Sequence, residues 1–184
     1  MAKILVADDD RIVRFTLADG LRQAGYEVIE AQDGESALDL CRNEDPALAL
    51  LDIRMPGLDG LELARRLKEE SDVPFVFFSA YGDEAFVQQA IAAGALGYLI
   101  KPLSVAAILP MIQTALARAR DISSLEGALA SNRTIATAVG ILMQQEGLDQ
   151  PAAFERLRES ARKHRRKMLD VALQIIEKSV KYQK

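Results

Sequence analysis

The chain has 184 residues, of which 49% are hydrophobic and 27% are charged. This length suits one ordinary domain with a small second unit, and the composition is that of a folded globular protein rather than a disordered one. The apolar stretches are too short for a membrane span, and the N-terminal residues show no signal-peptide pattern. We therefore expect a cytoplasmic protein that has no membrane partner.

The charges are distributed unevenly along the chain. Residues 1–129 carry 12 basic and 21 acidic side chains, a net charge of −9, whereas residues 130–184 carry 11 basic and 6 acidic ones, a net charge of +5. The two values add up to the formal charge of −4 for the whole chain. An acidic first part suits a metal ion and a basic second part suits a polyanion, although a solvated helix face also explains a small positive excess.

Two residue types that occur once each limit the possible chemistry. Cys41 can form neither an internal disulfide nor a cysteine metal cluster, and its apolar helical neighbours favour core packing over a redox role. His164 is the only histidine, so a histidine-rich metal site is excluded and no Ser-His-Asp triad is expected. Its place in a basic stretch favours an exposed residue.

The first 102 residues alternate short β-rich runs with amphipathic helical stretches. The predicted strands are residues 3–7, 27–30, 48–51, 75–78 and 97–100. The predicted helices between them are residues 12–24, 35–43, 61–70 and 84–93. Several strands are almost purely apolar, which is typical of parallel strands that are buried on both faces. The pattern predicts a five-stranded, doubly wound parallel α/β domain, in which ligands bind at the carboxyl ends of the strands.

From Ser104 onward the sequence is helical, and Pro110 is expected to bend this helix or to lie within its start. An apolar stripe with spacings of mostly three or four residues runs along it through Ile112, Leu116, Ala119, Ile122, Leu125, Leu129, Ala136, Val139 and Met143. The stripe predicts a packed or coiled-coil helix, with a single amphipathic helix folded back on the first domain as the alternative. Residues 147–151 end the helix, and two shorter helices at 152–162 and 168–181 complete a small three-helix, all-α bundle.

Reactive side chains gather at the ends of the predicted strands. In chain order they are Asp8, Asp9 and Asp10, then Asp52, Ser79 and Lys101. Clustered carboxylates repel one another unless a hard cation lies among them, and Mg²⁺ prefers such oxygen ligands. A metal also screens an incoming phosphoryl group, so that Asp52 can act as the nucleophile in an in-line transfer. Lys101 can then pair with a phosphoryl oxygen, and Ser79 can donate a hydrogen bond to it.

Four phrases lie at these strand ends: residues 6–10 (VADDD), 51–57 (LDIRMPG), 78–80 (FSA) and 98–102 (YLIKP). In these phrases the chain resembles the receiver domains of response regulators. The resemblance covers residues 2–120 and implies a flavodoxin-like receiver domain over residues 1–120.

The resemblance to receivers implies a role for each matched residue. Asp52 is expected to be the phosphoacceptor, and Asp9 and Asp52 are expected to ligate Mg²⁺, with Asp8 assisting through water and the Arg54 carbonyl completing the set. Ser79 and Tyr98 are expected to be the moving hydroxyl and aromatic that report the phosphoryl state. A cis bond is expected between Lys101 and Pro102, and a sensor histidine kinase is the expected partner. Taken singly, each residue is also compatible with a solvated loop acid or a core tyrosine.

Three phrases characterise the C-terminal part: residues 133–143 (RTIATAVGILM), 153–158 (AFERLR) and 165–168 (RRKM). They resemble the ANTAR family, the three-helix RNA-binding output domains of antitermination regulators, over residues 125–184. Gly140 in mid-helix indicates close approach of another helix or a ligand, and the basic run at 162–167 indicates a charge cluster, although such runs are more often solvated turns. The candidate RNA-binding residues are Arg133, Gly140, Arg162, Lys163, Arg165, Arg166 and Lys167.

These features together predict a two-component response regulator. Phosphorylation of Asp52 is expected to promote homodimerisation through the helix at 112–143, and so RNA-hairpin binding and transcription antitermination. The helix over residues 104–130 is expected to continue into a coiled-coil-like linker. An output that binds a protein or DNA is the alternative, and no enzyme activity on another substrate is expected. Because aromatic residues are few in the last third, recognition of folded RNA by shape and phosphate contact is favoured over stacking on single strands.

Overall fold

The computed structural model describes residues 1–80, 82, 84–102 and 104–181, except for the side chains of residues 180 and 181. The chain divides into two compact units, Met1–Asp121 and Ile122–Lys184. Each unit has a hydrophobic core of its own, and helix α5 (Val105–Glu146) contributes residues to both. None of the helices in the described part of the chain has an apolar stretch long enough to cross a membrane.

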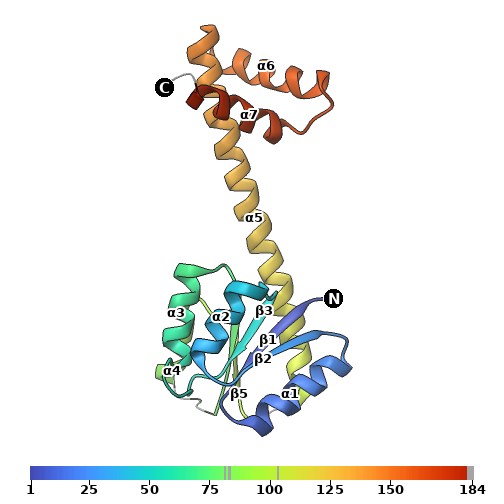
Figure 1. Cartoon of the computed structure of the whole chain (residues 1–184), viewed down its shortest axis with the longest axis vertical. Helices are drawn as coiled ribbons and strands as arrows, with labels where there is room; N and C mark the ends of the chain where they lie inside the picture. Colours follow the sequence, from blue (N-terminus) through green and yellow to red (C-terminus); the bar gives the residue numbers. More distant parts are fainter. Residues whose placement is uncertain (81, 83, 103, 182–184) are drawn as a thin grey trace. The chain divides into compact units, whose positions relative to one another are not determined.

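The first unit is built on a parallel five-stranded sheet with the strand order β2-β1-β3-β4-β5 (Figure 1). The strands are β1 (Lys3–Ala7), β2 (Glu27–Ala31), β3 (Leu48–Leu51), β4 (Phe75–Ser79) and β5 (Tyr98–Ile100). The chain goes from β1 outward to β2, then returns to β3 on the other side of β1. The carboxyl ends of β1 and β3 therefore lie side by side where the winding reverses, the usual place for a ligand site in such sheets.

Helices cover both faces of this sheet, which confirms the predicted fold class. One face packs against α1 (Arg11–Gln23) and the first turns of α5, and the other packs against α2 (Gly34–Glu44), α3 (Gly60–Glu70) and α4 (Glu84–Ala93). All four residues of β3 are buried as a result, which explains its purely apolar sequence. Burial also raises the pKa of the Cys41 thiol to about 12, so this thiol stays protonated at neutral pH and packs as an apolar group.

Aspartate side chains begin four of the helices. The carboxylates of Asp10, Asp33, Asp59 and Asp149 each accept a hydrogen bond from a backbone N–H in the first turn of α1, α2, α3 and α6 (Gln150–Lys163), respectively. Such a cap contributes about 1 kcal/mol to the stability of a helix. These helices begin directly after the capping residue, one or two residues earlier than the apolar spacing alone predicted.

The second unit is a three-helix bundle of the last turns of α5, α6 and α7 (Met168–Lys181). Its core is formed by the buried side chains of Ala138, Val139, Leu142, Ala153, Leu157, Ala161, Val171 and Ala172. Gly147 ends α5 with a φ of 66°, in the left-handed region that glycine adopts most easily. Pro151 lies in the first turn of α6, where its missing N–H costs nothing. The predicted bundle is thus confirmed.

The apolar stripe of α5 meets three different environments. Ile112 and Leu116 are buried in the core of the first unit, and Val139 is buried in the core of the second. Between them, Ile122, Leu125 and Leu129 are 46%, 66% and 61% exposed. Pro110 lies inside α5, in its second turn, and the helix continues past it. We refer to the exposed segment from Ile122 to Leu129 as the exposed stripe.

Candidate functional site

The carboxyl ends of four strands position the candidate phosphorylation site. Asp8 and Asp9 follow β1, Asp52 follows β3, Ser79 ends β4 and Lys101 follows β5. Hydrogen bonds of 2.8 Å fix the backbone here, from the Asp52 N–H to the Ala7 carbonyl and from the Lys101 N–H to the Ser79 carbonyl. Residues that are distant in the sequence are therefore held at one edge of the sheet.

Lys101 joins the two buried carboxylates of the site. Its Nζ lies 2.6 Å from Asp8 Oδ2 and 3.2 Å from Asp52 Oδ2, and it lies 5.2 Å from the centre of the Phe78 ring. Burial raises the pKa of the Asp8 carboxyl, and the hydrogen bond and charge of Lys101 oppose this shift. The ammonium group of Lys101 thus stabilises the two carboxylates, whose burial removes them from water.

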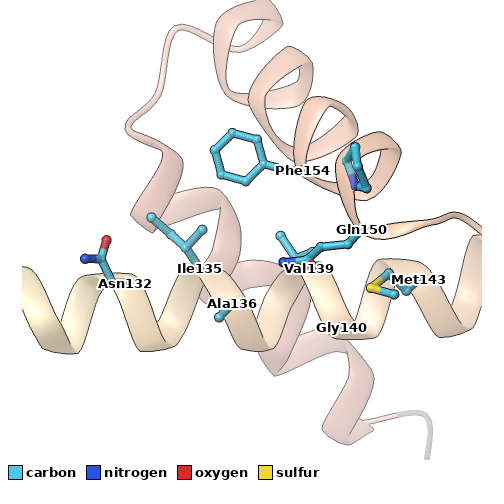
Figure 2. Close-up of a pocket in the computed structure, with 9 residues that line it drawn as sticks. Asn132, Ile135, Ala136, Val139, Gly140, Met143, Gln150 and Phe154 are labelled. Carbon is cyan, nitrogen blue, oxygen red and sulfur yellow. The ribbon is translucent and has the colours of Figure 1, made fainter.

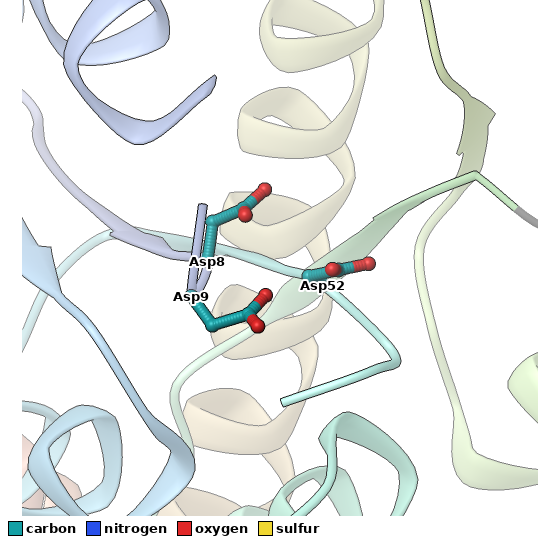
Figure 3. A group of neighbouring side chains, drawn as sticks. All are labelled: Asp8, Asp9 and Asp52. Carbon is teal, nitrogen blue, oxygen red and sulfur yellow. The ribbon is translucent and has the colours of Figure 1, made fainter. Parts of the chain in front are cut away.

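Asp8, Asp9 and Asp52 form a compact group of oxygen ligands (Figure 3). Their nearest ligand atoms all lie within 4.8 Å of one another, with Asp8 and Asp52 buried and Asp9 exposed. Three carboxylates so close together fit the preference of Mg²⁺ for oxygen ligands and its tendency to retain water on an open side. Asp10, which the sequence placed with them, instead caps α1 through Ile12 and Val13.

Three further residues were predicted from the sequence to belong to this site. Ser79 is fully buried at the end of β4. Tyr98 is half-buried at the start of β5, and its ring centre lies 6.3 Å from that of Phe77. The guanidinium of Arg54 lies 5.8 Å from the centre of the Phe86 ring. The Lys101-Pro102 bond is cis, as predicted.

Gly60 is a site residue whose role is not evident from the sequence. A Cβ atom at this position would lie 2.0 Å from the carbonyl oxygen of Asp52. The Gly60 N–H also donates a 2.9 Å hydrogen bond to the carbonyl of Ile53. The start of α3 therefore supports the loop that carries Asp52, and only glycine allows this approach. No local sequence signal distinguishes this contact from an ordinary turn.

The second unit presents the candidate RNA-binding residues on its surface. All seven are exposed: Arg133, Gly140, Arg162, Lys163, Arg165, Arg166 and Lys167. A Cβ atom at Gly140 would meet no described atom within 4 Å, so this glycine does not serve the close approach of another helix within the described chain. The basic residues from 162 to 167 lie at the end of α6 and in the turn before α7.

The turn after α6 is an ordered helix-ending motif. The N–H of Arg165 donates to the carbonyl of Arg162, and the N–H of Arg166 donates to the carbonyl of Ala161. Arg165 has a φ of 52°, in the left-handed region. These features define a Schellman motif, which usually has glycine at this position. The backbone that carries the basic residues is therefore held in a defined helix-ending turn rather than in an unstructured connector. His164, the last residue before Arg165, is exposed as predicted.

Comparison with known families assigns both units. Residues 4–113 match the model of the response regulator receiver domain, and residues 123–176 match that of the ANTAR domain. The chain is 33% identical over 183 residues to the transcriptional regulatory protein PdtaR of Mycobacterium tuberculosis, covering 95% of this chain and 89% of that protein. This chain belongs to the response regulators. The family is a regulatory one, and here a receiver domain is combined with an RNA-binding ANTAR output domain.

Other relatives of this response regulator match the receiver domain. It is 40% identical over 122 residues to the probable transcriptional regulator ycf27 of Porphyra purpurea, covering 66% of this chain and 50% of that protein. Among solved structures, the CheY-like receiver domain protein of Methanospirillum hungatei has a TM-score of 0.62 and 28% identity, covering 66% of this chain and 98% of the other. These similarities agree with the strand order described above.

Proposed function

We propose that Asp52 accepts a phosphoryl group from a sensor histidine kinase and that this modification controls RNA binding by the ANTAR domain. The observation that carries the proposal is the position of the Asp52 carboxylate, next to both the ammonium of Lys101 and two further carboxylates at one edge of the sheet. An oxygen of Asp52 attacks phosphorus while the bond between phosphorus and the donor histidine breaks. The histidine nitrogen keeps the bonding electron pair, and Lys101 stabilises negative charge on the phosphoryl oxygens.

Asp9 and Asp52 would hold Mg²⁺, with Asp8 acting through water and the carbonyl of Arg54 completing the ligand set. The ion supplies positive charge that offsets the repulsion between these carboxylates and the phosphoryl group. Lys101 is already paired with Asp8 and Asp52, so it can remain in place while the phosphoryl group arrives.

The kinase would dock on the surface of α1 next to the site. Ile12 and Phe15 are 77% and 64% exposed there, and their spacing of three residues places them side by side on the helix as a small apolar patch. A hollow of about 240 Å³ beside them is lined by residues that include Ile12, Lys101 and Pro102. An apolar helix of the partner that packed here would bring its histidine toward Asp52.

Ser79 and Tyr98 would pass the phosphorylation signal to α5. In the proposal, the Ser79 hydroxyl donates a hydrogen bond to a phosphoryl oxygen, and Tyr98 moves with it. Ser79 is buried in the strand next to β3, and Phe78 lies in the same core as Ile108 and Ile112 of α5. A shift at the end of β4 therefore has a packed route to the first turns of α5.

The output would be a dimer that binds an RNA hairpin and so causes transcription antitermination. Ile122, Leu125 and Leu129 repeat at intervals of three and four residues, which is the spacing of a coiled-coil seam. Their exposure leaves an apolar strip for a second copy to cover. The positive charge of residues 130–184 supplies the attraction for RNA phosphates.

Binding of RNA by the full chain tests this function. Labelled hairpins with a fixed stem and a randomised loop are titrated with protein that has been treated with beryllofluoride and Mg²⁺, at several salt concentrations. We expect activation to strengthen binding, affinity to fall as salt rises, and Asp52→Asn to abolish the response to beryllofluoride. A response that persists in Asp52→Asn shows that the phosphoacceptor is misassigned, and equal affinity for duplex DNA of the same length favours a DNA-binding output.

A further inference from the structure

A groove between α5 and α6 of the second unit lies outside the basic turn (Figure 2). Its volume is about 520 Å³, and its walls are mainly apolar: Ile135, Val139 and Met143 from α5, and Pro151 and Phe154 from α6. We call it the α5–α6 groove. The volume lies within the range of sites that take small organic groups.

The bundle core is complete without the side chains that form the outer part of the groove. Ala153 and Leu157 of α6 are fully buried, whereas their neighbour Phe154 is 39% exposed. Met143 is also exposed, at the end of the groove that lies toward the end of α5. An aromatic ring that is left at the surface beside a hollow has apolar area available for a ligand.

Small residues form the floor of the groove. Ala136 and Gly140 lie one turn apart on α5, and a Cβ atom at Gly140 would meet only open space. Glycine in the middle of a helix lowers stability by roughly 1 kcal/mol relative to alanine. Packing within the described unit gives no reason for a glycine at this position. A flat group that binds against the helix backbone gives one, because a larger side chain would occupy its place.

The rim and surroundings of the groove suit an RNA base better than an apolar side chain. Asn132 and Gln150 place exposed amides at the rim, and an amide offers both a donor and an acceptor to a base edge. None of the nine described lining residues is acidic. Three acidic residues near the groove in the sequence have partners: Asp149 caps α6, Glu146 pairs with Arg156, and Glu155 pairs with Arg158.

A phosphate contact is available beside the groove. Arg133 is exposed and precedes Gly140 by seven residues, close to two full turns, so it lies on the same side of α5.

A second copy of the chain is a weaker candidate for the occupant of the groove, because the large residues of the exposed stripe end at Leu129. Beyond that residue the same face carries Asn132, Ala136 and Gly140, and its next large exposed side chain is Met143 at the far end of the groove, so the part of the face between them offers little to a coiled-coil partner.

We propose that the α5–α6 groove receives one unpaired base from the loop of the RNA hairpin, stacked on Phe154 above Gly140. The inference rests on the proposed RNA binding and adds a base contact to the phosphate contacts of the basic turn. Sequence-specific recognition of RNA generally uses loop bases that can be unstacked and held on aromatic rings in this way.

A double-mutant cycle between protein and RNA tests the contact. The probe is the hairpin that wild-type full-length protein, activated by beryllofluoride, enriches from the pool with a randomised loop. Each loop nucleotide is then replaced by an abasic one. We expect Phe154→Ala to weaken binding by roughly ten- to a hundredfold, and one abasic position to abolish the difference between wild type and Phe154→Ala.

Two further variants separate the base contact from folding and from charge. Gly140→Leu fills the groove without meeting a neighbouring atom at its Cβ, so it should keep the helical circular dichroism and lose affinity for the intact loop. Phe154→Tyr keeps a stacking ring and should recover most of the affinity that Phe154→Ala loses. Because these changes remove no charge, the slope of log affinity against log salt should not change.

The possible failures are distinguishable. If wild-type protein enriches no loop and binds no hairpin, both the proposed function and this inference are wrong. If it binds hairpins but Phe154→Ala and Gly140→Leu bind equally well, RNA binding stands and the base site is wrong. If these two variants instead reduce self-association in sedimentation while RNA affinity is unchanged, the groove belongs to an interface between copies of the chain, and the inference is again wrong.

Discussion

The three consecutive aspartates that follow β1 have different surroundings. Asp8 is buried and pairs with Lys101, Asp9 is exposed beside Asp8 and Asp52, and Asp10 caps α1. Loss of the Asp8 carboxylate would leave the partly buried ammonium of Lys101 with one partner fewer, a costly change. Asp9 can lose its charge at little cost to folding because it remains in contact with water.

At the residue scale, Asp9→Asn should weaken Mg²⁺ binding to the full chain by about tenfold or more, since one anionic ligand is lost. Isothermal titration calorimetry with MgCl₂ measures the affinity. Asp10→Asn is the matched control, because it removes the same charge one residue away while asparagine still caps α1. Equal Mg²⁺ affinities for the two variants would contradict the assignment of Asp9 as a ligand.

At the scale of single elements, α6 ends in an unusual way. Helices α1 and α4 end in the same hydrogen-bond pattern with Gly25 and Gly94 in the left-handed position, each with a φ of 90°. Helix α6 has Arg165 there instead. A side chain in this conformation costs roughly 1 kcal/mol, and a strained residue that persists at a surface is a reason to look for a function. Its charge, held in a fixed turn, is the evident candidate.

Arg165→Gly should therefore stabilise the second unit and weaken RNA binding. Removing the backbone strain at Arg165 raises the free energy of unfolding of the second unit by about 1 kcal/mol. Amide exchange in α6 and α7 then slows by about fivefold, if these amides exchange through unfolding of the unit. Loss of one phosphate contact lowers the salt slope of RNA affinity by roughly one unit or less. Hydrogen–deuterium exchange and RNA titration on the full chain measure the two effects.

Arg162→Gly is the control for this variant. It removes the same charge, but Arg162 lies inside α6, where glycine lowers helix stability. The two variants should weaken RNA binding similarly and change amide exchange in opposite directions. Unchanged affinity in both would mean that the basic turn is only a solvated connector, whereas faster exchange in Arg165→Gly would contradict the strain at Arg165.

The sequence was informative about elements wherever a local pattern determines them. Short β-rich runs, several of them almost purely apolar like the one at β3, predicted all five strands, and the spacing of apolar side chains predicted the helices. The approach of Gly60 to Asp52 left no such pattern and required the fold. The capping role of Asp10 is instead a local contact with Ile12 and Val13, which an aspartate directly before a predicted helix already favours. The stripe of α5 is a second case in which the sequence pattern was not sufficient. Its apolar spacing is the same at Ile112, which is buried, and at Leu125, which is exposed.

At the scale of the whole molecule, α5 is the element that both units share. Its residues up to Asp121 belong to the receiver unit, and those from Ile122 belong to the ANTAR unit. The exposed stripe begins at this boundary. If phosphorylation favours pairing along the stripe, and if the pair binds RNA better than the single chain, the two equilibria are coupled. Hairpin RNA must then strengthen the dimer by the same factor by which dimerisation strengthens RNA binding.

Charged residues on the exposed stripe should break this coupling. Leu125→Glu with Leu129→Glu places like charges along the seam, so the double variant should accept a phosphoryl group on Asp52 yet remain a monomer, with an RNA affinity that activation no longer raises. Intact mass, sedimentation velocity and RNA titration measure these three properties.

Ser124→Glu with Ser131→Glu adds the same charge on the opposite side of α5, since these residues lie about half a turn away from the stripe, and it should behave like wild type. Both serines lie outside the two hydrophobic cores. A dimer formed by the activated Leu125→Glu, Leu129→Glu variant would show that the chains pair through another surface. A monomer whose RNA affinity still rises on activation would show instead that phosphorylation reaches the ANTAR domain without dimerisation.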